Sequence, residues 1–336
     1  MKRTSEGNHI AIVIPYFGKI PDYLGTYLAS LVDKHVDVLW ISDLPVPRHP
    51  ENFKSIPMTF DECKARIASR LGVPVRIDVA YRLCDFKPMY GQVFEDLLAD
   101  YDYWGFGDCD LVYGEPFNDF LDKVVLSGDY DVISLDPAYL SGPTCFFRND
   151  ARMRTFYRKT RNWKEVCAAA SLQSFDECGG EFHFQLMGGT MTMEDCSRIR
   201  DSFSAAVWRD PDLRFYHKEV IDERSLWRFG DVVVNGTQVL RNGEPVTVYH
   251  FISAKGACFF RTLNVPFERV RSYRITPTGF YHGDWMWRTR FPRKICRYVV
   301  GFLGYVRTYG MRRFVTRAFE TLIAYAKECR SSHGMP

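Results

Sequence analysis

The chain has 336 residues, of which 46% are hydrophobic and 25% charged, and its formal net charge is +3. Such values are typical of a soluble globular protein, long enough for one large α/β domain plus an appendage. The ten cysteines form no C-x-x-C pair, which excludes the usual zinc and disulfide frameworks. The first residues lack the apolar stretch of a signal peptide, so we expect a cytoplasmic protein.

The charge is unevenly distributed along the chain. Residues 288–330 carry eleven Lys or Arg and two Glu, a local charge of +9, which leaves −6 for the remainder. We therefore expect a mildly acidic main body followed by a basic tail.

The first 115 residues alternate between strand and helix patterns. In chain order they predict strand 9–14, helix 22–34, strand 36–41, helix 59–71, helix 87–99 and strand 101–107. The first strand is a continuous apolar run closed by Pro15, as expected for a parallel strand buried on both faces. Thr59 and Glu62 form the capping-box pattern at the start of a helix. The order indicates a doubly wound α/β fold.

The following region is less regular. It predicts helix 116–126, strand 131–135, an antiparallel edge segment at 144–147, and a mostly helical stretch from 150 to 235. Asn242-Gly243, between 238–240 and 246–248, predicts a hairpin.

Asp108 and Asp110 are the candidate metal ligands. Four D-x-D pairs occur in the chain, but only this one follows an apolar, aromatic strand and precedes a turn residue, Gly114. Residues i and i+2 of an extended segment project to the same side, so both carboxylates can address one ion. Hard oxygen ligands favour Mg²⁺ or Mn²⁺, whose remaining ligands are commonly water and substrate phosphates. A diphosphate-bearing substrate is implied.

Other phosphate chemistries fit less well. The turn after the first strand contains no G-x-G-x-x-G, and the chain has no P-loop, which disfavours nicotinamide and P-loop ATPase chemistry. Residues 108–112 do fit the D-x-D-x-[TV] pattern of dehalogenase-type phosphatases, with Asp108 as nucleophile. In that family the motif normally follows the first strand, whereas here a β-α-β unit precedes it. This alternative stays open.

Four segments together carry a resemblance to a known family: 12–18, 40–43, 83–91 and 103–110. In the third segment, Asp85 and Lys87 stand two apart, about twenty residues before the D-x-D. The set resembles metal-dependent glycosyltransferases of the GT-A fold. It is similar to a bacterial family of glycosyltransferases for polysaccharide (capsule or O-antigen) biosynthesis, over residues 9–255.

The resemblance implies a GT-A-like, Rossmann-type mixed sheet flanked by helices. The catalytic domain would be 1–260, with a nucleotide-sugar half to about 115 and an acceptor half after it; 261–336 would be a basic, amphipathic helical region. Asp108, Asp110 and His250 would hold Mn²⁺ or Mg²⁺ against the diphosphate of a nucleoside-diphosphate sugar, for which we expect a UDP-sugar. The donor-binding residues would be Pro15, Tyr16, Phe17, Gly18, Asp43, Asp85, Lys87 and Lys255.

Several of these residues have simpler explanations. Asp85 could be an N-cap, Lys87 a solvated first-turn residue, and His250 a hydrogen-bonded core residue. The acidic segment 176–183 lies where acceptor-side residues would lie. If the reaction inverts the anomeric centre, Asp176, Glu177 or Glu181 could take the proton of the acceptor hydroxyl; if it retains configuration, no such base is needed.

The tail predicts a membrane contact. Residues 311–326 have the spacing of a basic amphipathic helix, and 295–306 is apolar but too short to span a bilayer. With Trp285 and Trp287, the region 285–330 fits an interfacial anchor on an anionic membrane, which would place the enzyme on the inner face of the cytoplasmic membrane. Docking of this helix on the catalytic body or on a second subunit is the alternative. Nucleic-acid binding would leave its apolar face unused.

We therefore expect a glycosyltransferase that acts on a growing surface polysaccharide or a lipid-linked oligosaccharide. The alternatives are the phosphoryl-transfer enzyme with the Asp108 nucleophile and a non-catalytic membrane-surface module.

Overall fold

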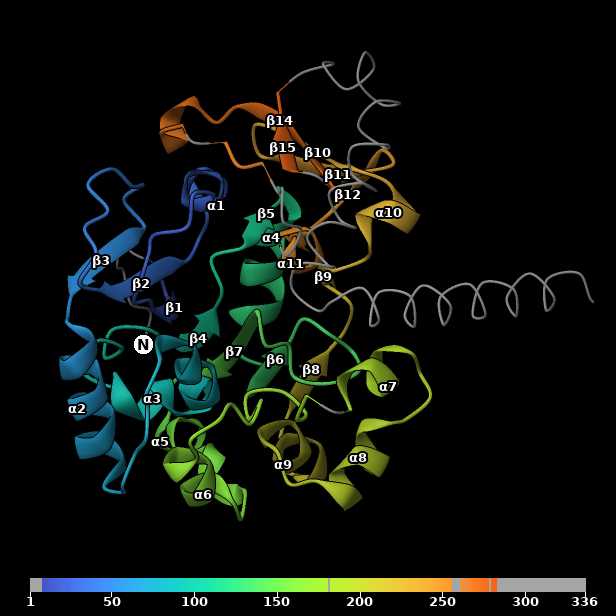
Figure 1. The fold of residues 1–336 in the computed structure, drawn as a ribbon. Helices are drawn as coiled ribbons and strands as arrows, with labels where there is room; N and C mark the ends of the chain where they lie inside the picture. The colour runs from blue at the N-terminus through green and yellow to red at the C-terminus, as the bar shows by residue number, and fades with distance from the viewer. Residues whose placement is uncertain (1–7, 181, 256–260, 264, 278, 283–336) are drawn as a thin grey trace, which may run out of the picture.

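The protein is built around a seven-stranded mixed sheet (Figure 1). The computed structural model describes residues 8–282, apart from 181, 256–260, 264 and 278. The strands of this sheet are, in spatial order, β3 (Phe53–Pro57), β2 (Asp37–Ser42), β1 (Ile10–Pro15), β4 (Tyr103–Gly107), β7 (Thr144–Arg148), β6 (Val132–Ser134) and β8 (Phe215–His217). The expected α/β fold, with a mixed sheet between helices, is confirmed.

The first four strands are parallel and follow the doubly wound order. β2 and β3 extend to one side of β1, whereas β4 pairs with β1 on the other side. The direction of winding therefore reverses between β1 and β4. In open α/β sheets ligands bind outside the carboxyl ends of the strands at such a reversal. This rule points to the segments after Pro15 and after Gly107.

The segment predicted as an antiparallel edge lies inside the sheet. β7 is antiparallel to β4 and to β6, so the direction was right but the position was wrong. β7 can lie there because Gly105 of β4 has no side chain: a Cβ atom would come within 2.4 Å of the Cys145 carbonyl oxygen. Four of the five β7 residues are buried, as in a central strand.

Helices cover both faces of the sheet. Alternate residues of β1 face opposite cores. Ala11 and Val13 pack in the core that contains residues of α2 (Phe60–Leu71) and α9 (Phe203–Arg209). Ile10, Ile12 and Ile14 pack in the core that contains residues of α1 (Leu24–Leu31) and α4 (Pro116–Phe120). Figure 1 shows α1 on the opposite side of the sheet from α2. The helices of the main body are α1 (Leu24–Leu31), α2 (Phe60–Leu71), η1 (Ala80–Met89), α3 (Tyr90–Val93), α4 (Pro116–Phe120), η2 (Leu121–Val125), α5 (Ala151–Arg154), η3 (Phe156–Lys159), α6 (Trp163–Ala168), α7 (His183–Met187), α8 (Met193–Ile199) and α9 (Phe203–Arg209).

Helix α2 has the predicted capping box, in which Thr59 and Glu62 bond reciprocally. The helix predicted at 87–99 is wrong in extent. The chain instead forms a 3-10 helix at Ala80–Met89 (η1), followed by one α-helical turn at Tyr90–Val93 (α3). Pro88 lacks an N–H to donate, and Gly91 packs so closely on Trp104 that a Cβ atom would lie 2.5 Å from its ring.

Two smaller sheets complete the described chain. The three-stranded sheet contains β5 (Leu111–Tyr113), β13 (Val248–His250) and β9 (Ile221–Asp222). The five-stranded sheet contains β12 (Glu244–Pro245), β11 (Gln238–Arg241), β10 (Val232–Asn235), β14 (Ser272–Thr276) and β15 (Gly279–Tyr281). Short helices adjoin them: α10 (Leu226–Phe229), α11 (Ile252–Lys255) and η4 (Phe267–Arg269).

The predicted hairpin at Asn242-Gly243 is confirmed. Both turn residues have positive φ, 53° and 87°, as a two-residue turn of type I′ requires. The second strand of the hairpin, β12, has only two residues, because the chain then crosses to β13 in the three-stranded sheet.

The segment after residue 260 differs from the expected helical appendage. β14 pairs with β10, so a boundary at 260 would divide one sheet, and the described part of 261–282 contains strands. Residues 283–336, with Trp285, Trp287 and the predicted helix 311–326, lie outside the described residues. Within the part that is described, no helix combines the length and apolar character needed to cross a bilayer.

Candidate active site

A cavity of about 610 Å³ opens at the carboxyl ends of β1 and β4. Pro15, Tyr16 and Phe17 line it from the end of β1, and Asp108 and Asp110 line it from the end of β4. This is the place where the doubly wound order reverses, as the general rule for open α/β sheets requires.

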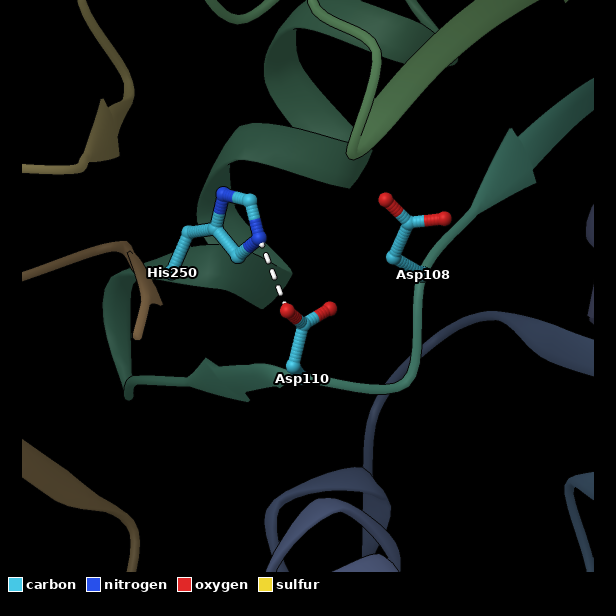
Figure 2. A group of neighbouring side chains, drawn as sticks. All are labelled: Asp108, Asp110 and His250. Carbon is cyan, nitrogen blue, oxygen red and sulfur yellow. Dashed lines mark hydrogen bonds and ion pairs between the residues drawn. The ribbon is translucent and has the colours of Figure 1, made fainter. Parts of the chain in front are cut away.

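Asp108, Asp110 and His250 form a compact group. One ligand atom from each lies within 4.8 Å of the others. Figure 2 shows both carboxylates rising from the turn after β4, with the His250 ring facing Asp110. Cys109, between the two acids, is buried and belongs to the hydrophobic core on the α1 side of the sheet. Carboxylate oxygens and an imidazole nitrogen are common ligands of divalent metals, so the residues present fit a divalent cation.

The three-stranded sheet brings these distant residues together. Within it, His250 of β13 lies opposite Leu111 of β5, the residue after Asp110. The Phe251 N–H donates to the Asp110 carbonyl at 3.2 Å, which fixes the two segments side by side. The family resemblance had suggested His250, and the register of β13 on β5 explains why its side chain reaches the D-x-D.

The charges around Asp110 are closely paired. Its carboxylate bonds the His250 Nε2 atom at 3.1 Å and forms an ion pair with Lys255. Burial would raise the pKa of Asp110, but these two cations hold it well below its usual value. Burial likewise would lower the pKa of His250, but its carboxylate neighbours raise it to about 10. Lys255 is therefore already beside the group that would hold the cation.

Lys87 links this group to the opposite wall. Its Nζ atom lies 2.9 Å from Asp108 Oδ1, 3.5 Å from Asp176 Oδ2 and 2.7 Å from the Gly142 carbonyl oxygen, to which it donates. The side chain is buried, which disfavours its charged form, but the adjacent carboxylates outweigh this and raise its pKa. Lys87 is thus not the solvated residue of the simpler explanation.

Asp176 and Glu177 line the same cavity, on the far side of Lys87 from Asp108. They stand in the irregular segment between α6 and α7. Burial raises the pKa of each to about 7, against the opposing charge of Lys87. Gly142 accommodates Glu177, since a Cβ atom there would lie 2.1 Å from its carboxylate. Carboxyl groups that titrate near neutrality are suited to proton transfer.

The predicted donor-binding residues separate into two groups. Pro15, Tyr16, Phe17, Lys87 and Lys255 line the cavity. The other three do not: Gly18, Asp43 and Asp85.

Asp85 has a clear structural role. Its carboxylate is fully buried, accepts from the backbone N–H groups of Gln173 and Phe175 at 2.9 Å, and is ion-paired with Arg82. It therefore anchors the segment that leads to Asp176. It is not the N-cap of the simpler explanation, because η1 begins at Ala80, before Asp85. Glu181, the third candidate base, lies outside the described residues.

The sequence did not reveal Glu223 or the aromatic rim of the cavity. Glu223 follows β9 and bonds the His250 Nδ1 atom at 2.5 Å. Tyr81 and Phe184 line the cavity although 71% and 82% of their surfaces are exposed. Only the three-dimensional pairing of β9 with β13 makes Glu223 distinctive, because a lone Glu after a short strand carries no signal.

Comparison with known proteins gives a family but no function. No curated protein matches the chain. A solved structure of mouse xyloside xylosyltransferase 1, in its apo form, aligns with 73% of this chain and 98% of its own, at 8% identity and a TM-score of 0.40, a likeness too slight to argue from. A family model described as a family of unknown function, DUF6625, matches residues 12–283, the region that holds the complete cavity. The chain therefore belongs to the DUF6625 family.

Proposed function

We propose that this protein is a glycosyltransferase that takes a sugar from a nucleoside-diphosphate sugar, with the help of a divalent cation. The observation that carries the proposal is the group of Asp108, Asp110 and His250 at the point where the sheet reverses its winding. A cation held there would offset the charge on the departing diphosphate. Lys255 and Lys87, both in the same cavity, would contact the phosphates.

The donor would lie along the end of β1. Tyr16 stacks on Trp40 with ring centroids 4.8 Å apart, which gives a firm aromatic surface beside the cavity for the base. Asp43, exposed at the end of β2, is suited to a ribose hydroxyl or a base N–H, and Gly18 completes the turn after β1. We propose a UDP-sugar as donor and Mn²⁺ or Mg²⁺ as the ion.

The acceptor would approach from the other wall. In an inverting reaction Asp176 or Glu177, or Glu181 beyond them, would take the proton from the acceptor hydroxyl. Burial holds the pKa of Asp176 near 7, so this group can accept and release a proton near neutral pH. Exposed Tyr81 and Phe184 offer aromatic faces on which a sugar ring can pack.

We further propose that the acceptor is a growing surface polysaccharide or a lipid-linked oligosaccharide. The support is the basic region 285–330, with its amphipathic pattern and flanking tryptophans. Binding to anionic vesicles by the full chain, and loss of that binding on truncation at 284, would test the placement on the inner face of the cytoplasmic membrane.

Calorimetry with UDP, GDP and CMP, with and without Mn²⁺, tests the main proposal. We expect Mn²⁺-dependent affinity for one nucleoside diphosphate. In Asp110→Asn this affinity should fall at least roughly 100-fold, because loss of a residue that only bonds a metal ligand already lowers metal affinity by about 10–100-fold. Asp100→Asn, in another D-x-D and exposed, is the control.

Two results would overturn the proposal. One is an absence of affinity for all three nucleotides. The other is a phosphoenzyme, trapped with fluoride-type phosphate analogues and lost in Asp108→Asn, which would favour phosphoryl transfer instead.

A further inference from the structure

We propose that Glu223 is a positioning residue for the metal centre: it holds the His250 ring so that Nε2 faces the cation. The inference rests on the proposed function, since it concerns the same centre. It adds a fourth residue that carries no sequence motif and does not itself touch the cation.

The geometry comes from strand pairing. β9 lies parallel to β13, with Asp222 opposite Tyr249, so Glu223 and His250 are adjacent where the two strands end. Glu223 Oε1 lies 2.5 Å from the His250 Nδ1 atom, whereas Nε2, on the far edge of the ring, lies 3.1 Å from Asp110 Oδ2. The imidazole thus lies between two carboxylates, one at each nitrogen.

The backbone that carries Glu223 is clamped on both sides. The Asp222 carboxylate lies 2.8 Å from Arg224 Nη2 and 3.1 Å from Nε of buried Arg241, and it accepts from the Arg224 backbone N–H at 3.0 Å. The backbone beside Glu223 is therefore fixed by ion pairs of its neighbour Asp222, in addition to the bond that Glu223 makes to His250. A side chain only 14% exposed on so fixed a turn has little freedom to leave Nδ1.

A histidine that binds a metal through Nε2 benefits from a hydrogen-bond acceptor at Nδ1. A histidine that binds a metal through Nε2 must present a lone pair there, so its remaining proton must be on Nδ1. A carboxylate that accepts the Nδ1–H fixes this tautomer, holds the ring angle and makes the ligand more basic. A carboxylate offers lone pairs on both of its oxygens, whereas a neutral imidazole offers one only at the nitrogen that carries no proton, so His250 needs this support. In the described part of the site, Glu223 contacts the His250 Nδ1 atom, which is where a carboxylate can fix the tautomer.

Mn²⁺ binding to the full-length protein, followed by electron paramagnetic resonance, tests the inference without any assay of turnover. We expect Glu223→Ala to weaken Mn²⁺ binding by roughly 10–100-fold and to reduce the imidazole nitrogen coupling to bound Mn²⁺. Glu223→Gln keeps an oxygen that accepts the Nδ1–H, so it should restore most of the affinity and the coupling. Glu219→Gln, exposed and four residues earlier, is the matched control and should bind like the wild type.

Asp110→Asn separates failure of this inference from failure of the proposed function. If Asp110→Asn binds Mn²⁺ normally, the metal centre itself is wrong. If Asp110→Asn loses Mn²⁺ but both Glu223 variants bind like the wild type, with an unchanged nitrogen coupling, Glu223 has no positioning role. If Glu223→Gln loses binding as completely as Asp110→Asn, Glu223 is a direct ligand and the positioning role is overturned.

Discussion

The two walls of the cavity are built differently. On one side, which the proposed function makes the metal wall, Asp110, Glu223 and His250 stand at the ends of three paired strands. On the other, which the proposed function makes the acceptor wall, Asp176 and Glu177 stand in an irregular segment between two helices. Paired strands fix side chains closely enough to hold an ion, whereas loops on a rigid frame commonly set specificity. The difference teaches that the metal wall is preorganised for one task and that the acceptor wall is the adjustable part.

Buried charges connect the two walls. Lys87 contacts Asp108 on one side and Asp176 on the other, and Asp85, two residues earlier, bonds the backbone of the acceptor segment. Two residues of η1 therefore connect the segment that carries Asp176 to the group that contains Asp108. Variants that loosen one wall and leave the other intact would test this division.

Asp85→Asn should have the largest effect. It breaks the buried pair with Arg82 and weakens the bonds to Gln173 and Phe175, so we expect a loss of about 3 kcal/mol in the free energy of unfolding. Acceptor KM should rise while Mn²⁺ affinity stays near the wild-type value. Urea unfolding, acceptor kinetics and Mn²⁺ titration measure the three quantities.

Asp96→Asn provides the control for that variant, because Asp96 pairs with Arg66 and Arg70 at the surface, where such pairs contribute about 1 kcal/mol or less. A fall in nucleotide-sugar affinity with unchanged acceptor KM would contradict the division, and would instead support a direct contact of Asp85 with the donor.

Glu177→Gln should show an intermediate effect that depends on pH. Burial raises the pKa of Glu177 from 4.5 to about 7, so the folded state keeps the neutral acid where the unfolded state has lost its proton. The wild type therefore loses stability relative to the variant as pH rises from 4.5 to 7.5. We expect the free energy of unfolding of the wild type to fall by about 1–2 kcal/mol relative to the variant. This is less than the full rise in pKa would give, because 23% of the Glu177 side chain is exposed.

Thermal unfolding of both proteins across this pH range measures the difference. Glu165→Gln, exposed on α6, corrects for the general effect of removing one acidic charge. A constant difference at every pH would show that Glu177 is already ionised in the folded protein.

Phe184→Ala should have the smallest effect on stability, within about 0.5 kcal/mol, because 82% of the residue is exposed. If its ring contacts the acceptor, KM for the acceptor should rise roughly fivefold, equivalent to about 1 kcal/mol. Ile199→Ala, on α8 and 66% exposed, removes a similar surface that does not line the cavity. Equal kinetics for the two variants would remove Phe184 from the acceptor wall.

The sequence predicted the elements with strong local signals. The apolar run of β1, the capping box of α2 and the Asn242-Gly243 turn each depend on residues within a few positions of one another. The errors came from contacts that no local pattern contains. β7 is central because Gly105 lets it approach β4, and η1 is not an α-helix because of Pro88 and the closely packed Gly91.

The candidate site divides in the same way. Asp108 and Asp110 could be predicted because a strand, a turn and a spacing of two occur together in one segment. Glu223 could not, since its significance depends on the pairing of β9 with β13. Asp85 is the opposite case. Its place in the sequence predicted a donor-binding residue, but its carboxylate accepts hydrogen bonds from two backbone N–H groups.

The three-stranded sheet has a consequence for the order in which the protein folds as it is synthesised. Its strands begin at Leu111, Ile221 and Val248, and the side chains that meet across it, Asp110 and His250, stand 140 positions apart. A nascent polypeptide on the ribosome can assemble β1 to β4 early, but it has no complete ion site until His250 has emerged. In the proposed enzyme, a copy that ends before His250 would therefore lack part of the ion site.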